Sequence, residues 1–309
     1  MTRPPLRIAT RKSQLALWQA EHVAALLRAA HPGIEVELVP MSTKGDQILD
    51  RSLAAIGGKG LFIKELEVAM QDGDADIAVH SMKDVPAELP DGFLIGAVLE
   101  RADPHDALLT TRYRGFDDLP AGARIGTSSL RRQAQLLAAR PDLRIEGLRG
   151  NVNTRLKRLD DGQLDAIVLA CAGLVRLGWE ARITARLEPS VSLPAVGQGV
   201  IGIECRSDDA PTLQLLAALE HAGTRREISA ERAFSGRLGG SCQSPIAAFA
   251  TPAGDVLTLD GLVAEPDGSR LLRDQVTGPA SDPQTLGFAL AERLLAAGAG
   301  ALLERLRAD

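Results

Sequence analysis

The feature of this sequence that most constrains its fold is the alternation of short apolar runs with amphipathic stretches from residue 6 to residue 220. Buried strands of a parallel sheet are continuous apolar runs, and helices that cover such a sheet have a period of about 3.6 residues. The pattern predicts strands at residues 6–10, 35–41, 77–80, 93–99, 107–110, 124–127, 143–148, 165–170 and 200–204. It predicts helices from Ser13 to about Ala30 and at residues 61–71, 129–139, 151–159 and 212–220. We therefore expect an α/β fold whose sheet is covered on both faces.

Two local echoes indicate that this α/β region contains two similar lobes. Residues 8–10 resemble residues 125–127, and residues 72–79 resemble residues 161–168. Both echoes fall at equivalent places in the order of strands and helices. We predict that residues 1–100 with 200–218 form lobe 1, that residues 104–195 form lobe 2, and that a cleft lies between them.

The pattern changes beyond residue 220, where strands follow one another without helices between them. Strands are predicted at residues 246–250, 256–263 and 271–276, after a helix at 225–238 and before one final helix at about 284–307. This order predicts a small α+β domain, residues 222–309, with a three-stranded antiparallel sheet. Paired glycines after Leu238 are a plausible helix stop.

Composition narrows the class of protein. The chain is 45% hydrophobic and 24% charged with a net charge of −5 and 3% aromatic residues, which argues against a general nucleic-acid binder. No stretch has the continuous apolar core of a signal peptide or a membrane span. Three cysteines without close spacing argue against a disulfide framework or a metal site. We expect a cytoplasmic protein with no metal and no nucleic-acid or membrane partner.

Basic side chains stand at the start of three predicted helices, where the helix dipole favours negative charge by about 0.3 to 1 kcal/mol. Each lies beside a hydroxyl or amide residue suited to cap the helix. The three groups are Arg11 and Lys12 with Ser13, Arg131 and Arg132 with Thr127 and Ser129, and Arg149 and Arg155 with Asn151. Such positions suit a ligand with several negative charges, although solvated charge is the alternative. Carboxylates and phosphates fit equally well, but residues 57–60 lack the pattern of a phosphate loop.

A cluster of titratable residues follows the predicted strand at residues 77–80. A carboxylate at Asp84 is placed where open α/β sheets carry their chemistry, and it would exchange protons or balance a cationic intermediate. A structural pair of Lys83 with Asp84 is the alternative. We expect His80, Cys171 and Cys205 to be core residues.

Cys242 lies in a small polar loop, residues 239–245, between the predicted helix and strand of the third domain. Burial and function are both open from the pattern alone, because free cysteine is often buried. A cysteine hydrolase needs a histidine base beside the thiol, and none of the five histidines is marked as that partner. Cys242 is better interpreted as an attachment point.

Seven motifs are spread along the chain, at residues 11–16, 58–62, 80–84, 126–132, 149–152, 154–156 and 240–242. Taken together, they resemble the porphobilinogen deaminase family, also called hydroxymethylbilane synthases, over essentially the whole chain. The resemblance implies two lobes similar to type II periplasmic binding proteins and a third domain that bears a cofactor.

The family resemblance implies a transferase of tetrapyrrole and heme biosynthesis. Its dipyrromethane cofactor would be joined by a thioether to Cys242. Four molecules of porphobilinogen, a small-molecule substrate with acetate and propionate side chains, would be added head to tail with loss of ammonia. Water would then release hydroxymethylbilane. The enzyme would be a monomer.

The resemblance also implies roles for individual residues. Asp84 would be the catalytic acid/base group and would contact the cofactor. The other cofactor-binding residues would be Lys83, Thr127, Ser129, Arg131 and Arg132, and the substrate-binding residues would be Arg11, Ser13, Lys59, Arg149, Arg155 and Arg176. A non-catalytic, two-lobed carboxylate-binding protein is the rival interpretation, and it leaves Cys242 and Asp84 without a role.

Overall fold

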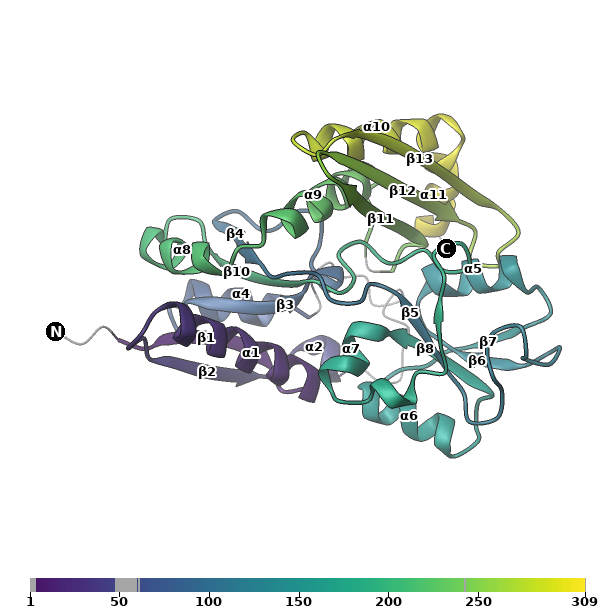
Figure 1. The fold of residues 1–309 in the computed structure, drawn as a ribbon, viewed down its shortest axis with the longest axis horizontal. Helices are drawn as coiled ribbons and strands as arrows, with labels where there is room; N and C mark the ends of the chain where they lie inside the picture. Colours follow the sequence, from purple (N-terminus) through teal and green to yellow (C-terminus); the bar gives the residue numbers. More distant parts are fainter. Residues whose placement is uncertain (1–3, 48–59, 61, 242, 309) are drawn as a thin grey trace. The chain divides into compact units, whose positions relative to one another are not determined.

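The computed structural model describes residues 4–47, 60, 62–241 and 243–308. The chain divides into two compact units, which are considered separately (Figure 1). Unit 1 comprises Met1–Ala102 and Val200–Arg225, and unit 2 comprises Asp103–Gly199 and Arg226–Asp309. Lys59 and Cys242, two of the predicted site residues, lie outside the described residues.

Unit 1 is built on a five-stranded sheet with the order β2-β1-β3-β10-β4. β1 is parallel to both β2 and β3, whereas β10 is antiparallel to β3 and β4. The strands are β1 (Leu6–Arg11), β2 (Val36–Met41), β3 (Ile77–Ser81), β4 (Phe93–Val98) and β10 (Ile201–Arg206). The helices are α1 (Gln14–Ala30), α2 (Lys44–Gln47), α4 (Lys64–Gln71), α8 (Ala210–Leu216) and the short 3₁₀ helices η1 (Met82–Asp84) and η3 (Ala217–Leu219).

Helices cover both faces of the unit 1 sheet, as the apolar pattern predicts. Alternate side chains of the strands, such as Ile8 and Ile203, pack with α1, α8 and η3. The opposite face contributes Ala9 and Ala78 to a smaller cluster with α4. These strands are therefore buried on both sides, which explains their continuous apolar runs.

Unit 2 contains a second five-stranded sheet of the same design, with the order β7-β6-β8-β5-β9. β6 is parallel to β7 and β8, and β5 is antiparallel to β8 and β9. The strands are β5 (Asp106–Leu109), β6 (Arg124–Gly126), β7 (Arg144–Glu146), β8 (Ala166–Ala170) and β9 (Ala185–Leu187). The helices are α5 (Leu130–Ala139), α6 (Val152–Asp160), α7 (Cys171–Arg176) and η2 (Glu180–Arg182).

The matching sheets confirm the prediction of two similar lobes. The sequence echoes lie in equivalent places, since residues 8–10 belong to β1 and residues 125–127 to β6 and its end. One carboxylate in each longer echo makes the same contact. Asp76 accepts the backbone N–H of Arg7 at 2.8 Å, and Asp165 accepts that of Arg124 at 2.8 Å.

The remainder of unit 2 is the predicted α+β region. Its three antiparallel strands have the order β11-β12-β13. One face packs on Phe234 and Leu290, and the other contributes Ala247 and Leu262 to a cluster with Ala134 of α5. The elements are α9 (Ala222–Arg237), which begins in unit 1, β11 (Ile246–Ala253), β12 (Val256–Ala264), β13 (Leu271–Pro279), α10 (Pro283–Ala296) and α11 (Ala299–Ala308).

One local prediction was wrong, and some short elements were missed. The final segment is two helices, α10 and α11, bent by 82°, because Gly298 has φ +102° and interrupts the helical path. Strand β9 and helix α7 were not predicted, since neither has enough residues to show a period. Cys171 therefore begins a helix, although it is buried as expected.

No single helix within the described residues is long and apolar enough to cross a membrane. The bent pair of α10 and α11 passes that test by length and composition only.

Candidate functional site

In unit 1, four of the predicted site residues stand at one edge of the sheet. β1 and β3 are adjacent and parallel, so their carboxyl ends meet at the same edge. Arg11 is the last residue of β1, Ser13 caps α1, and Lys83 and Asp84 form η1 directly after β3. A strand, a helix start and a turn thus bring these side chains to the place where α/β sheets carry their sites.

Hydrogen bonds from neighbouring elements hold the turn that carries Asp84. The Met82 N–H donates to the Val200 carbonyl oxygen at 3.0 Å, and the Val85 N–H donates to the Met82 carbonyl oxygen at 3.1 Å. The Gln19 side chain of α1 donates to the Ser81 hydroxyl at 2.8 Å. Asp84 is therefore carried by a segment fixed to α1 and to the start of β10.

Phe62 is a further aromatic neighbour of this group. The Arg11 guanidinium lies 4.3 Å from the centre of its ring, which is the geometry of a cation–π contact. Phe62 is part of the motif at residues 58–62, but its spacing in the chain does not predict that it lies beside Arg11.

His80 is a core residue, as predicted. It is 5% exposed, and its Nε2 lies 2.8 Å from Oε2 of Glu204, which is fully buried. On α4, burial raises the pKa of the Glu67 carboxyl, and the Glu204 carboxylate raises it further. His80 therefore belongs to a buried polar group on β3, the strand that precedes the turn with Asp84.

The three helix starts predicted to bind anions have the expected caps. Ser13, Ser129 and Asn151 are the N-cap residues of α1, α5 and α6, and each side chain accepts a backbone N–H of the first turn. None of the three helices carries an acidic residue in its first turn. The positive ends of these dipoles are therefore not neutralised by a side chain of the same turn.

Arg131 and Arg132 are buried, and both contact one carboxylate. Arg131 Nη1 donates to Asp106 Oδ2 at 2.8 Å, and Arg132 Nη2 donates to Asp106 Oδ1 at 2.7 Å. Their side chains are 4% and 7% exposed, and that of Asp106 is fully buried. Burial alone would raise the pKa of Asp106, but the two guanidiniums hold it well below its usual range. The trio carries one positive charge in excess.

Two further side chains complete this group. The Ser192 hydroxyl donates to Asp106 Oδ2 at 2.7 Å, and the Gln198 amide donates to Asp106 Oδ1 at 3.0 Å. Sequence reasoning missed Asp106, Ser192 and Gln198. The available signal was a carboxylate at the head of the apolar run Asp106–Leu109, where an unpaired charge would be costly.

The other predicted binding residues of unit 2 stand near the carboxyl ends of its parallel strands. Thr127 follows β6 and is buried, and Arg149 follows β7 and is partly buried. Arg155 of α6 donates from Nε to the Gly150 carbonyl oxygen at 2.9 Å. Arg176 ends α7 and donates to the Gly199 carbonyl oxygen at 2.7 Å, and burial lowers the pKa of its guanidinium to about 10.

The loop that contains Cys242 is described on both sides of that residue. Helix α9 ends at Arg237, and Gly239 has φ +62°, which confirms the predicted helix stop. A methyl group on Gly240 would lie 2.6 Å from the Ser235 hydroxyl and 2.9 Å from Cδ1 of Ile246. Close packing inside the domain is thus one reason for the second glycine.

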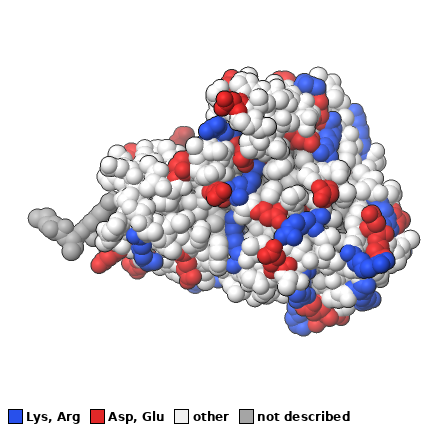
Figure 2. Space-filling model, viewed as in Figure 1, with Lys and Arg blue, Asp and Glu red and all other residues white. Residues whose placement is uncertain are grey.

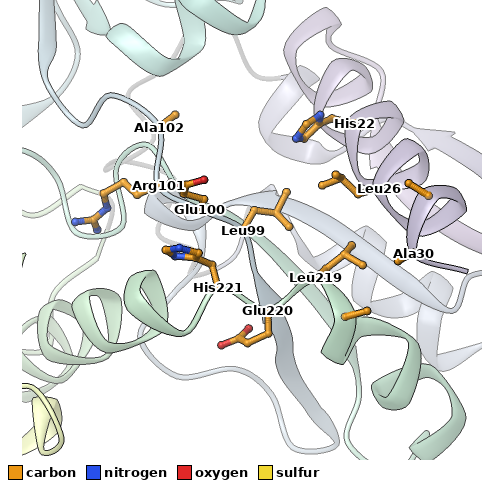
Figure 3. Close-up of a pocket in the computed structure, with 12 residues that line it drawn as sticks. His22, Leu26, Ala30, Leu99, Glu100, Arg101, Ala102, Leu219, Glu220 and His221 are labelled. Atoms are coloured by element: carbon orange, nitrogen blue, oxygen red, sulfur yellow. The ribbon is translucent and has the colours of Figure 1, made fainter.

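A pocket of about 660 Å³ lies elsewhere in unit 1 (Figure 3). Its lining includes His22 and Leu26 of α1, Arg101, Leu219 and His221, and none of the predicted site residues. The face of the molecule in Figure 2 carries basic and acidic side chains interspersed. Among the described residues, no group of three or more His, Cys, Asp or Glu side chains is arranged to hold a metal ion.

The fold and these side chains define a class: an α/β protein with two similar lobes, several capped helix starts with basic residues beside them, and a carboxylate just after a strand end. Comparison with known proteins names the family within that class. Residues 6–214 match the family model described as "Porphobilinogen deaminase, dipyromethane cofactor binding domain", and residues 225–296 match "Porphobilinogen deaminase, C-terminal domain". The chain belongs to the porphobilinogen deaminase family, and the transferase activity and dipyrromethane cofactor expected from its motifs are supported.

A curated relative covers nearly the whole chain. It is the porphobilinogen deaminase of Xanthomonas euvesicatoria pv. vesicatoria (strain 85-10), 60% identical over 301 residues, which are 97% of this chain and 99% of the relative.

Two solved structures with more distant similarity are a domain of BvgS and a lipoprotein. The VFT2 domain of BvgS from Bordetella pertussis is 16% identical with a TM-score of 0.42, over 70% of this chain and 87% of that domain. A putative methionine-binding lipoprotein from Bacillus subtilis is 12% identical with a TM-score of 0.43, over 71% of this chain and 92% of that one.

Proposed function

We propose that this chain adds four porphobilinogen molecules head to tail to a dipyrromethane primer attached to Cys242, releases ammonia at each addition, and frees hydroxymethylbilane by hydrolysis. The observation that carries the proposal is the buried group of Arg131, Arg132 and Asp106, because two guanidiniums share one carboxylate. A buried charge in excess is costly unless a further opposite charge relieves it. Acetate and propionate side chains would supply such charges.

The donors of this group fit a carboxylate-bearing pyrrole chain. Guanidinium groups bind carboxylates through paired hydrogen bonds, and capped helix starts add backbone N–H groups. We propose that Lys83, Thr127, Ser129, Arg131 and Arg132 hold the cofactor. The residues that would bind the carboxylates of incoming substrate are Arg11, Ser13, Lys59, Arg149, Arg155 and Arg176.

Asp84 would be the acid/base residue. Its carboxyl group would donate a proton to the leaving amino group as ammonia departs, and its carboxylate would then balance the cationic pyrrole that remains. The bound dipyrromethane would supply the nucleophilic pyrrole carbon at which the chain grows. The hydrogen bonds that fix Ser81 and Met82 would keep Asp84 in place during this transfer.

Cys242 would carry the cofactor through a thioether, for which the other two cysteines are poor candidates. Cys171 and Cys205 are fully buried, and burial raises the pKa of their thiols to about 12 and about 11. A thiol attacks as its thiolate, so neither residue is suited to form the bond.

Intact mass spectrometry of freshly purified protein tests this attachment. The chain should carry the mass of one dipyrromethane, Cys242→Ser should carry none and be inactive, and the control Cys205→Ala should keep both adduct and activity. An unmodified, active wild-type chain, or an adduct that persists in Cys242→Ser, would contradict the proposal.

The rival function, a carboxylate-binding protein without catalysis, is not favoured, because both domains of the deaminase family are matched in order along the chain. We further propose three domains, at residues 1–100 with 200–218, 104–195 and 222–309. The protein would act as a cytoplasmic monomer without nucleic-acid or membrane partners. Light scattering of the purified chain would test whether it is a monomer, and cell fractionation would test whether it is cytoplasmic.

A further inference from the structure

Strand β10 lies directly against the segment that carries Asp84. Ile201 and Gly202 pair with Ser81 and His80 in the antiparallel register, and the Val200 carbonyl oxygen accepts the Met82 N–H at 3.0 Å. Met82 is the first residue of η1 and Asp84 is the last. Any shift of Met82 is thus a shift of the turn that ends in Asp84.

The side chain of Met82 lies over Gly202. Met82 is 1% exposed. A methyl group built on Gly202 would overlap the Met82 sulfur, lie 3.1 Å from its Cγ and lie 3.7 Å from Cγ2 of Ile95. Gly202 has no positive φ, so the need for glycine here comes from space and not from backbone conformation. Because Gly202 has no side chain, the Met82 side chain can pack over it.

Strand β3 is held too firmly to absorb a displacement of Met82. It is paired with β1 on one edge and with β10 on the other. The buried hydrogen bond between His80 and Glu204, at 2.8 Å, fixes it further. Met82 is itself the first residue of η1, so a displacement of Met82 would be passed to this turn and would rotate Asp84.

We propose that Gly202 is a positioning residue for Asp84: by leaving room for the Met82 side chain, it sets the orientation of the turn that presents the catalytic carboxyl group. This inference rests on the catalytic role proposed above for Asp84. It adds that β10, a strand more than one hundred residues further along the chain, determines where that carboxyl group points.

The first test is Gly202→Ala, measured as holoenzyme with rates expressed per molecule that carries the cofactor by mass. We expect kcat to fall about tenfold to a hundredfold, because a displacement on the order of 1 Å is enough for such a loss. KM for porphobilinogen should change by less than about twofold, since the residues proposed to bind substrate are not moved. An unchanged kcat would overturn the inference.

A matched control lies in the same sheet. A methyl group on Gly96 of β4 would lie 2.8 Å from Leu216 Cδ1 and 2.9 Å from Cys205 Sγ, side chains that pack toward α8. Gly96→Ala therefore introduces similar crowding away from the turn. It should lower thermal stability and leave kcat per loaded enzyme near the wild-type value. If it lowers kcat as much as Gly202→Ala, general destabilisation is the cause and the inference fails.

A double variant keeps the test decisive if Gly202→Ala folds poorly. Met82→Ala alone should lower kcat, because the turn loses its buried side chain. The double variant Met82→Ala/Gly202→Ala should fold better than Gly202→Ala alone, because the new methyl group occupies the space that Met82 vacates. Its kcat should be no lower than that of Met82→Ala alone. Losses in kcat that add independently would refute the coupling.

Asp84→Asn separates this inference from the proposed function. If Asp84→Asn keeps near-normal kcat, the role of Asp84 fails whatever the glycine variants do. If Asp84→Asn is inactive while Gly202→Ala is normal, only the positioning role of Gly202 is lost.

Discussion

Asp106 shows at the scale of one residue how a buried charge organises a candidate site. It accepts hydrogen bonds from Arg131, Arg132, Ser192 and Gln198, which come from three separate parts of the chain. The sequence predicts the two arginines because they start a capped helix. It does not predict their shared partner, because Asp106 lies 25 residues before Arg131 and just outside the predicted strand at residues 107–110.

Replacing Asp106 tests the importance of this group. Asp106→Ala leaves two guanidiniums buried without their carboxylate, so the free energy of unfolding should fall by about 3 to 5 kcal/mol. Urea denaturation measures the change. Asp142→Ala, which removes the exposed partner of Arg140, is the control and should have little effect. Similar midpoints for the two variants would show that the buried group contributes little to stability.

At the scale of the element, helix α4 carries a carboxyl group, Glu67, in an unusual environment. Burial raises the pKa of Glu67, the Glu204 carboxylate raises it further, and His80 and Lys64 oppose the shift. The helix is predicted from its apolar residues, since Leu66 and Met70 face the sheet. Burial is the largest cause of the raised pKa of Glu67, and Glu204, a residue of a distant strand, adds to it.

The pH dependence of stability follows from that raised pKa. Glu67 contributes stability that is fully present below its unfolded pKa of about 4.3, and this contribution is lost as the pH rises through the higher folded value. Glu67→Gln removes the titration. Relative to wild type, the variant should therefore gain stability as the pH increases through that range, measured by thermal melts from pH 4 to about pH 8. A difference that does not vary with pH would contradict the assignment.

At the scale of the whole molecule, the two lobes repeat one design down to single contacts. Asp76 and Asp165 hold the same position in the two longer echoes. Each accepts the backbone N–H of the residue just before a shorter echo, which is Arg7 in one lobe and Arg124 in the other. The sequence predicts the repeat, but only the strand orders show that the sheets are equivalent.

That equivalence predicts matched effects of two substitutions. Asp76→Asn and Asp165→Asn should each speed hydrogen exchange locally, at the amides of Arg7 and Arg124 respectively, because each amide exchanges a charged acceptor for a weaker, neutral one. Exchange measured by mass spectrometry should show the change in the altered lobe only. A change in both lobes from one substitution would mean that the contacts are not locally equivalent.

The sequence by itself determined the strand and helix pattern, the helix caps at Ser13, Ser129 and Asn151, the repeat of the lobes and the family. These features depend on residues close together in the chain, whose spacing is visible without a fold. Only the tertiary structure decided that Arg131 and Arg132 share Asp106, that Met82 lies over Gly202, and that the last helix breaks at Gly298. The first two are contacts between segments that only the folded sheets bring together. The third depends on a backbone conformation that glycine permits but does not impose.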